Sequence, residues 1–142
     1  MVKVKLYKNN IKKNNKGDVY KYIEISNSFK KISEVYFSKI KKNSIKAWKK
    51  NNTSNQFFYI FDGKIILKIF DDRRKNKKTY NFTLGKESKY SKILIPKNVW
   101  YGFKGLEKNN VIVNSLSTLH KNCKMQSLEI NNNYIPIAWN KN

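Results

Sequence analysis

The stretch QFFYIFDGKIILKIF, residues 56–70, contains two apolar runs on either side of Asp62-Gly63. This dipeptide is favoured in tight hairpins because it accepts positive φ angles. Alternate residues of a strand share one face of the sheet. In the first run, one face is formed by Phe57, Tyr59 and Phe61. In the second run, one face is formed by Ile65, Leu67 and Ile69, and Lys64 and Lys68 lie on the other face of that strand. The stretch therefore predicts two antiparallel strands joined by a hairpin.

Further strand patterns follow at intervals of about 8–14 residues, with turn residues between them. They occupy residues 33–40, 44–48, 78–84, 92–96 and 111–117, with weaker patterns at 19–25 and near the N-terminus, where we expect an edge strand. No segment has a sustained apolar stripe of helical period, although residues 120–130 could form a turn or two of helix. The pattern predicts an all-β antiparallel barrel or jelly roll, as a single domain over residues 1–142.

The composition excludes several classes of protein. Apolar residues make up 39% of the 142 residues and aromatic residues 14%, which is enough for a hydrophobic core and argues against disorder. No apolar run is long enough to span a membrane, and no secretory signal is visible at the N-terminus. Cys123 is the only cysteine, so an internal disulfide is impossible. We expect a soluble protein in the cytoplasm.

The net charge of +22 is the most unusual number in the composition. Lysine supplies 29 of the 31 basic residues, and Arg73 and Arg74 are the remaining two. Lysine, asparagine and isoleucine share A/T-rich codons, so a bias in genomic base composition would produce this profile without selection for a polyanion. Proteins that grip phosphate or read bases favour arginine, and here the lysines are scattered. Nucleic-acid binding is the less favoured alternative, although a cleft in such a surface would attract anions.

Five segments, taken in order, resemble the cupins related to dTDP-4-dehydrorhamnose 3,5-epimerase. They are EVYFS (34–38), KAW (46–48), FDGKIILKIFDDR (61–73), IPKNVWYGF (95–103) and IPIAW (135–139). The resemblance extends from about residue 16 to residue 139. It implies a double-stranded β-helix, usually a homodimer, that binds a nucleotide-linked sugar inside the barrel. In active epimerases of this family a histidine base removes a proton beside a C4 keto group, and a tyrosine returns a proton on the opposite face.

This chain departs from the family pattern at its histidines. After KGW the family subgroup has a histidine, a spacer and a second histidine, where this chain has Lys49, Lys50 and Asn51. The histidine of the family's VWHGF segment corresponds to Tyr101. The only histidine of the chain is His120, near a point where the family often has a histidine or tyrosine.

Three residues are therefore candidates for proton transfer, each with an alternative role. Lys49 occupies the position of the family's base, where it could act as a base or contact a phosphate, or simply face solvent. Tyr101 could donate a phenolic proton or fill the core. His120 could act as an acid or base, or be solvated in its loop.

Six further residues are candidates for substrate binding. Arg73 could hold a pyrophosphate with its two-pronged guanidinium group, or pair structurally with Asp71 or Asp72. Aromatic rings could stack on a base or sugar, or pack in the core. The six are Lys46, Trp48, Gln56, Phe58, Arg73 and Trp100.

We expect neither a metal nor a cofactor, because cupin metal sites need two or three histidines with a carboxylate and this chain has one histidine. Three functions stay open: an epimerase or keto-isomerase of nucleotide sugars, a binding protein for such anions, and a basic nucleic-acid binder. Trp139 and Pro136 are expected to fasten the C-terminal segment onto the barrel.

Overall fold

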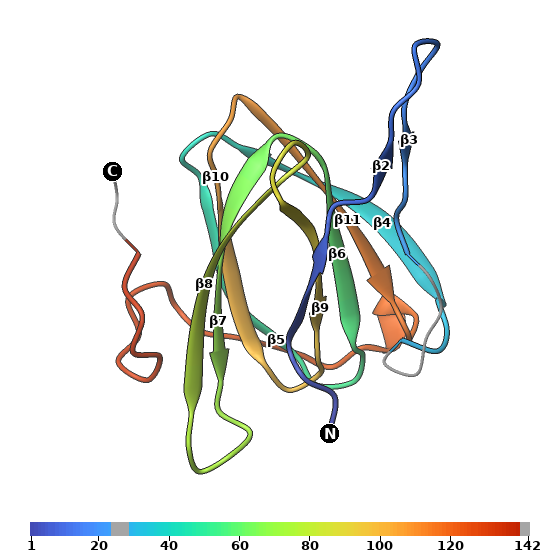
Figure 1. Ribbon diagram of the computed structural model, residues 1–142. Coiled ribbons are helices and arrows are strands. Elements are labelled where there is room, and N and C mark those ends of the chain that lie inside the picture. The colour runs from blue at the N-terminus through green and yellow to red at the C-terminus, as the bar shows by residue number, and fades with distance from the viewer. Residues whose placement is uncertain (24–28, 140–142) are drawn as a thin grey trace.

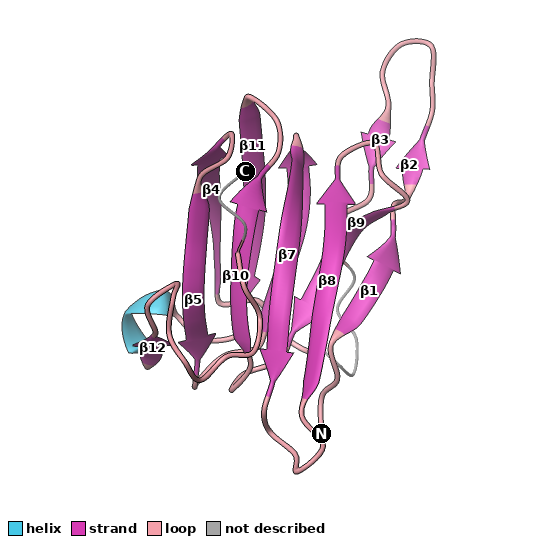
Figure 2. Ribbon diagram, turned by 90° about the vertical axis from the view of Figure 1, so that its left-hand side faces the viewer, coloured by secondary structure: helices cyan, strands magenta, loops and turns pink. Residues whose placement is uncertain are grey.

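The computed structural model of the protein describes residues 1–23 and 29–139. Over these residues, two five-stranded antiparallel sheets lie face to face (Figures 1 and 2). In spatial order, the first sheet contains β1 (Lys5–Lys8), β9 (Tyr90–Ile95), β6 (Gln56–Asp62), β11 (Asn109–Leu116) and β4 (Glu34–Lys41). The second sheet contains β12 (Met125–Ser127), β5 (Ile45–Asn51), β10 (Trp100–Gly105), β7 (Lys64–Asp71) and β8 (Lys78–Gly85).

Two small elements complete the described structure. A two-stranded ribbon of β2 (Ile11–Lys12) and β3 (Val19–Tyr20) projects from the sandwich, and a single 3-10 turn, η1 (His120–Asn122), precedes β12 (Figure 1). The strand pattern predicted at residues 19–25 lies partly outside the described residues. Within the described chain, no helix is long and apolar enough to cross a membrane.

From β4 to β7 and again from β8 to β11, each successive strand joins the sheet opposite to its predecessor. This winding of the chain between two antiparallel sheets is a double-stranded β-helix, the jelly roll of the cupins. The all-β fold expected from the strand spacing is confirmed.

The predicted hairpin at Asp62-Gly63 is wrong. β6 pairs with β9 and β11, whereas β7 pairs with β8 and β10, so the turn passes the chain from the first sheet to the second. The positive φ that the dipeptide favours is present, at 78° for Gly63. The turn is held by the start of β11, because the Lys64 N–H donates to Asn110 Oδ1 at 2.9 Å. The dipeptide identifies the turn but does not determine which strands pair.

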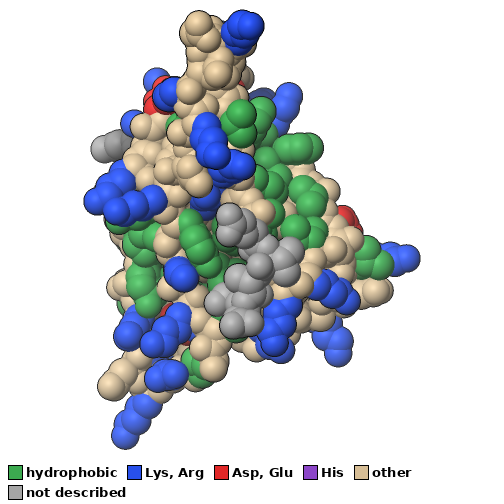
Figure 3. Space-filling model, turned by 45° about the vertical axis from the view of Figure 1, so that its right-hand side comes forward, with side chains coloured by type: hydrophobic (Ala, Val, Ile, Leu, Met, Phe, Trp, Pro, Cys, Tyr) green, Lys and Arg blue, Asp and Glu red, His purple; other side chains and the backbone are tan. Residues whose placement is uncertain are grey.

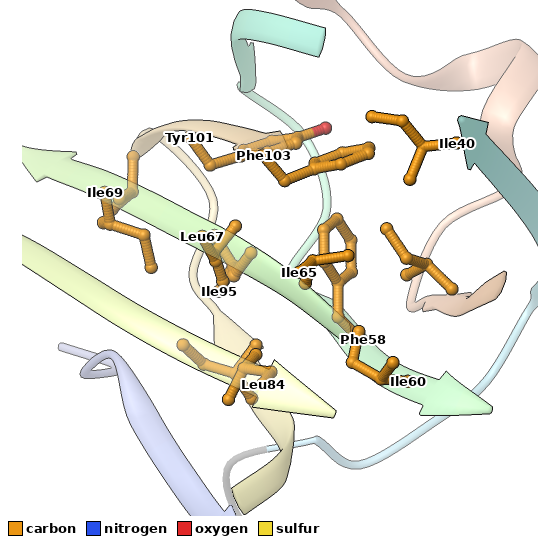
Figure 4. Packing of buried hydrophobic residues seen from close by; sticks show 13 residues of the cluster. Ile40, Phe58, Ile60, Ile65, Leu67, Ile69, Leu84, Ile95, Tyr101 and Phe103 are labelled. Atoms are coloured by element: carbon orange, nitrogen blue, oxygen red, sulfur yellow. The ribbon is translucent and has the colours of Figure 1, made fainter. Parts of the chain in front are cut away.

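The main core lies between the two sheets. Ile65, Leu67 and Ile69 are fully buried in it, as the alternation along β7 predicts (Figure 4). On β6 it is Phe58 and Ile60 that point into this core. The expected set on β6 does share a face, but that face is the outer one, where Phe57 packs with Tyr7, Tyr22 and Phe29 and Phe61 is exposed.

The C-terminal segment covers the outer face of the second sheet. Trp48, Phe70, Trp100 and Ile135 form a separate buried cluster there, and the rings of Trp48 and Trp139 are 5.8 Å apart. Lys68 adds a hydrogen bond from its ammonium group to the Ala138 carbonyl, at 2.9 Å. Trp139 therefore fastens the C-terminal segment, as expected, whereas Pro136 is exposed.

Candidate functional site

A cavity of about 350 Å³ opens between the two sheets. Its first wall comes from β4, β6 and β11 of the first sheet, and its second wall from β5 and β10 of the second sheet. The 3-10 turn η1 contributes at the rim. The lining residues that matter below are Glu34, Tyr36, Lys46, Lys49, Tyr101 and His120.

The β4 part of the wall is polar because the polar residues of that strand, and not the apolar ones between them, face the cavity. Glu34, Tyr36 and Ser38 line the cavity, so the residues between them face outward. Those residues are apolar and exposed, with 46% of Val35 and 69% of Phe37 accessible to solvent. The polar face of this strand is thus the inner one.

The second wall contributes two lysines from one strand at an uneven spacing. Tyr101 pairs with Lys49 and Phe103 with Lys46, so the two residues on β10 are two positions apart, whereas the two on β5 are three positions apart. An extra residue on one strand is a β-bulge, and it shifts the alternation downstream. Because of this bulge, both lysines face the cavity, while Trp48 between them faces outward.

Behind the cavity, four side chains form a hydrogen-bonded chain that links the two sheets. The Tyr101 hydroxyl donates to Gln56 Oε1 at 3.4 Å, and Asn114 Nδ2 donates to the same oxygen at 3.0 Å. Asn114 Nδ2 also donates to the Tyr36 hydroxyl at 2.7 Å. Among the described residues, Gln56 Nε2 and Asn114 Oδ1 are buried without a partner. Such buried groups are costly to leave unpaired, which makes this part of the wall suited to a polar ligand.

Tyr36 and Tyr101, the two phenols of this hydrogen-bonded set, are both weaker acids than free tyrosine. Burial raises the pKa of Tyr101, which is 6% exposed, and the hydrogen bond with Gln56 offsets only part of the rise. Burial also raises the pKa of Tyr36, and there the hydrogen bond from Asn114 acts in the opposite direction. Both phenols are therefore protonated at neutral pH and could donate a proton, not accept one.

His120 is exposed at the rim of the cavity. Its ring meets the ring of Tyr36 edge-on, with centroids 5.6 Å apart. The Glu34 carboxylate accepts a hydrogen bond from the His120 backbone N–H at 3.0 Å and so fixes the start of η1. The only histidine of the chain is thus held beside a tyrosine on the same cavity.

The structure brings Lys46, Lys49, Phe58, Tyr101 and His120 to this one cavity. Gln56 lies behind its wall, 1% exposed, and contacts the cavity-lining residues Tyr101 and Asn114. Figure 4 shows Tyr101 and Phe103 extending from β10 to the same side, close to Phe58.

Three of the residues predicted for substrate binding lie elsewhere. Trp48 and Trp100 pack under the C-terminal segment on the outer face of the second sheet, because the β5 bulge and the alternation of β10 turn them away from the cavity. Arg73 pairs with Asp71 through Nε and Nη2, at 2.8 Å each, and its Nη1 donates to the Val2 carbonyl at 2.8 Å. Its guanidinium group is occupied with holding the N-terminal segment.

Tyr36 and Asn114 are cavity residues that were not among the sequence-based candidates. The available signal was the alternation within EVYFS, which puts Glu34, Tyr36 and Ser38 on one face. The apolar Val35 and Phe37 made the other face look like the inner one. As for metals, no group of three or more His, Cys, Asp or Glu side chains that could hold an ion occurs within residues 1–23 and 29–139.

Comparison with solved structures defines the class of fold. The dTDP sugar isomerase from Desulfovibrio desulfuricans G20 superposes with a TM-score of 0.87 at 26% identity, over 96% of this chain and 90% of that one. The dTDP-4-dehydrorhamnose 3,5-epimerase from Bacillus anthracis str. Ames was solved with TDP and PPi bound. It superposes with a TM-score of 0.78 at 14% identity, over 96% of this chain and 84% of that one. A sugar 3,4-ketoisomerase from Thermoanaerobacterium thermosaccharolyticum in complex with TDP superposes with a TM-score of 0.66 at 16% identity, over 82% of each chain.

The chain therefore has the cupin fold of the dTDP-sugar epimerases and isomerases, and the resemblance inferred from its five segments is confirmed at that level. No protein-family model matches the sequence, and neither does any curated protein.

Proposed function

We propose that this protein binds a nucleotide-linked sugar in the cavity between its sheets and serves deoxysugar or surface-polysaccharide synthesis. The observation that carries the proposal is the cavity itself, with Lys46 and Lys49 on one wall and hydroxyl and amide groups on the other. Lysine ammonium groups attract phosphate, whereas phenols and amides suit the hydroxyl and keto groups of a sugar. The likeness to solved nucleotide-sugar enzymes, among them the dTDP sugar isomerase, supports the same ligand class.

The size of the cavity limits what it holds. Ligand pockets have volumes of about 300–1,000 Å³, so 350 Å³ is near the lower end. A hexose fits such a space, and the nucleotide would then extend over the exposed lysines of the rim. In this arrangement the sugar meets Tyr36, Tyr101 and Asn114.

The enzymatic form of the proposal is a metal-independent epimerase or keto-isomerase in which other side chains replace the family's histidines. Such a reaction needs at least two proton-transfer groups on one cavity. Lys49, Tyr101 and His120, the residues proposed for this role, all line it. The alternative is a binding protein with the same ligand and no turnover.

A nucleic-acid role has less support. Figure 3 shows lysine side chains spread over the face that it presents, with hydrophobic side chains between them. A cytoplasmic location and a homodimer stay predictions from the sequence, the second testable by sedimentation.

The experiment that tests the function is thermal unfolding with dTDP, dTDP-glucose, UDP-glucose and inorganic pyrophosphate, each at low and at moderate salt. A ligand at about 100 times its Kd stabilises the folded state by roughly 2.7 kcal/mol. The proposal predicts a shift that is selective for a nucleotide sugar and survives moderate salt. Equal shifts with every anion, lost on adding salt, would overturn it.

A further inference from the structure

The two phenols of the cavity differ in what their hydroxyl groups do. The Tyr101 hydroxyl donates its proton to Gln56 Oε1, so that proton is already engaged. The Tyr36 hydroxyl instead accepts a hydrogen bond from Asn114 Nδ2 at 2.7 Å, and no described residue accepts a proton from it. The Tyr36 proton is therefore free to point at a ligand.

The surroundings of Tyr36 also favour its loss of a proton during a reaction. A donor aimed at a phenolic oxygen stabilises the phenolate that forms when the proton leaves. Asn114 is such a donor, and it is held from behind by its second hydrogen bond, to Gln56 Oε1 at 3.0 Å. Tyr36 is half-buried, whereas Tyr101 is 6% exposed and more strongly desolvated.

A side chain that could replace the proton lies beside Tyr36 as well. The ring of His120 lies edge-on to Tyr36, with centroids 5.6 Å apart, and His120 is exposed to solvent. A histidine in contact with both a phenol and water can return a proton to the phenol between turnovers. On the opposite wall, Lys49 of the second sheet lines the same cavity.

We propose that Tyr36 is the proton donor of this site and that Asn114 is its positioning residue. This assignment rests on the proposed function in its enzymatic form, with a 4-keto nucleotide sugar as substrate.

In the step that this assignment describes, the Lys49 amine removes a proton from the carbon beside the keto group and becomes an ammonium group. The electron pair of the broken C–H bond forms the enolate, whose charge lies on the former keto oxygen. The Oη–H bond of Tyr36 then breaks as the carbon takes that proton on its opposite face, and the keto group re-forms. The phenolate of Tyr36 is reprotonated through His120, and the Lys49 ammonium group returns its proton to water.

The test uses dTDP-4-keto-6-deoxyglucose in deuterium oxide, with the product analysed by NMR for deuterium and for configuration. Tyr36→Phe keeps the ring and removes the donor. We expect inversion to fall about 100-fold or more, the usual size of a general-acid contribution, while Kd changes less than threefold. Exchange of the carbon-bound proton continues in this variant, because the base on the other wall still removes it and returns deuterium to the same face.

Two further variants make this result specific. Tyr59→Phe is the matched control, because Tyr59 faces outward from β6 and removing its hydroxyl should change neither inversion nor exchange. Asn114→Ala should lower the rate about tenfold and move the alkaline limb of the pH–rate profile upward, since the phenolate of Tyr36 loses its donor.

Three outcomes would overturn the assignment. The first is full inversion in Tyr36→Phe together with its loss in Tyr101→Phe. The second is loss of binding in Tyr36→Phe, which would show that the hydroxyl serves to hold the sugar and not to donate a proton. The third is tight binding by the unaltered protein with no exchange at all, which would leave the binding function standing. Absence of binding by the unaltered protein is different, because it contradicts the proposed function itself.

Discussion

Tyr101 of β10 lies directly opposite Lys49 of β5 in the antiparallel register, and both side chains line the same cavity. The sequence resemblance predicts that the family has histidines at these two positions. On that prediction, the two altered positions are cross-strand neighbours on one patch of wall. An altered pair at one place changes the chemistry of a site without dismantling the barrel around it. The proton donor that we propose, Tyr36, lies on the other wall of the same cavity.

Replacing Lys49 by methionine should weaken the binding of dTDP-glucose about tenfold or more. A hydrogen bond to a charged group contributes about 1.5–3 kcal/mol, and methionine keeps the length of the side chain without its charge. Lys39→Met is the matched control, because it removes the same charge from the outer face of β4. Titration calorimetry measures both. Equal weakening in the two variants would show that the general positive field, and not a contact in the cavity, attracts the ligand.

Replacing Arg73 by methionine should destabilise the fold by about 1.5–3 kcal/mol at neutral pH. The variant loses the hydrogen bonds of the guanidinium group to Asp71 and to the Val2 carbonyl. Arg74→Met is the control, since Arg74 is exposed and its Nε donates to Met1 Sδ instead of to Asp71. Urea unfolding compares them. A loss of stability as large in Arg74→Met would show that the net charge matters and the pairing does not.

The same pair predicts a pH dependence. Arg73 lowers the pKa of Asp71 below its ordinary value of 3.8 in the folded state. The stability that this carboxylate contributes is therefore complete above about pH 4 and is lost as the pH falls through the lowered pKa. The difference in unfolding free energy between the unaltered protein and Arg73→Met should narrow below pH 4. A difference that stays constant from pH 7 to pH 3 would contradict this linkage.

Gly63→Ala should destabilise the protein by at least about 2 kcal/mol. The residue has a φ of 78°, and an added Cβ would lie 2.2 Å from the Asn109 carbonyl oxygen. Gly17→Ala is the control, because Gly17 also has a positive φ but nothing lies within 4 Å of an added Cβ. Thermal unfolding of the two variants separates the steric cost from the conformational cost. Equal losses would mean that the crossing between sheets at Gly63 tolerates a side chain.

Strand positions and fold class could be predicted from the sequence because alternation is a local property. β7, β8, β9 and β11 all lie close to where their patterns place them. The pairing partners of β6 and β7 could not be predicted, because the same Asp-Gly turn serves a hairpin and a crossing between sheets. What decides between them is non-local, since the residues of β6 find partners on β9 and β11.

The sequence also did not predict which face of a strand points inward. The outer face of the second sheet is covered by the C-terminal segment, so Trp48 and Trp100 are buried without being in the cavity. On β5 an extra residue between Lys46 and Lys49 breaks the alternation, and a bulge of this kind leaves no mark in the local sequence. On β4 the apolar Phe37 faces solvent, which hid the role of Tyr36 on the inner face.

The central claim is that a nucleotide sugar occupies the cavity between the sheets. Titration calorimetry of dTDP-glucose with the unaltered protein and with Ser38→Trp, at about 150 mM salt, tests it most directly. Ser38 lines the cavity from β4, so an indole at this position fills the space that the sugar needs. We predict saturable binding by the unaltered protein and at least tenfold weaker binding by the variant, with both proteins folded in the absence of ligand. Equal affinity in the two proteins would place the ligand outside the cavity and contradict the account.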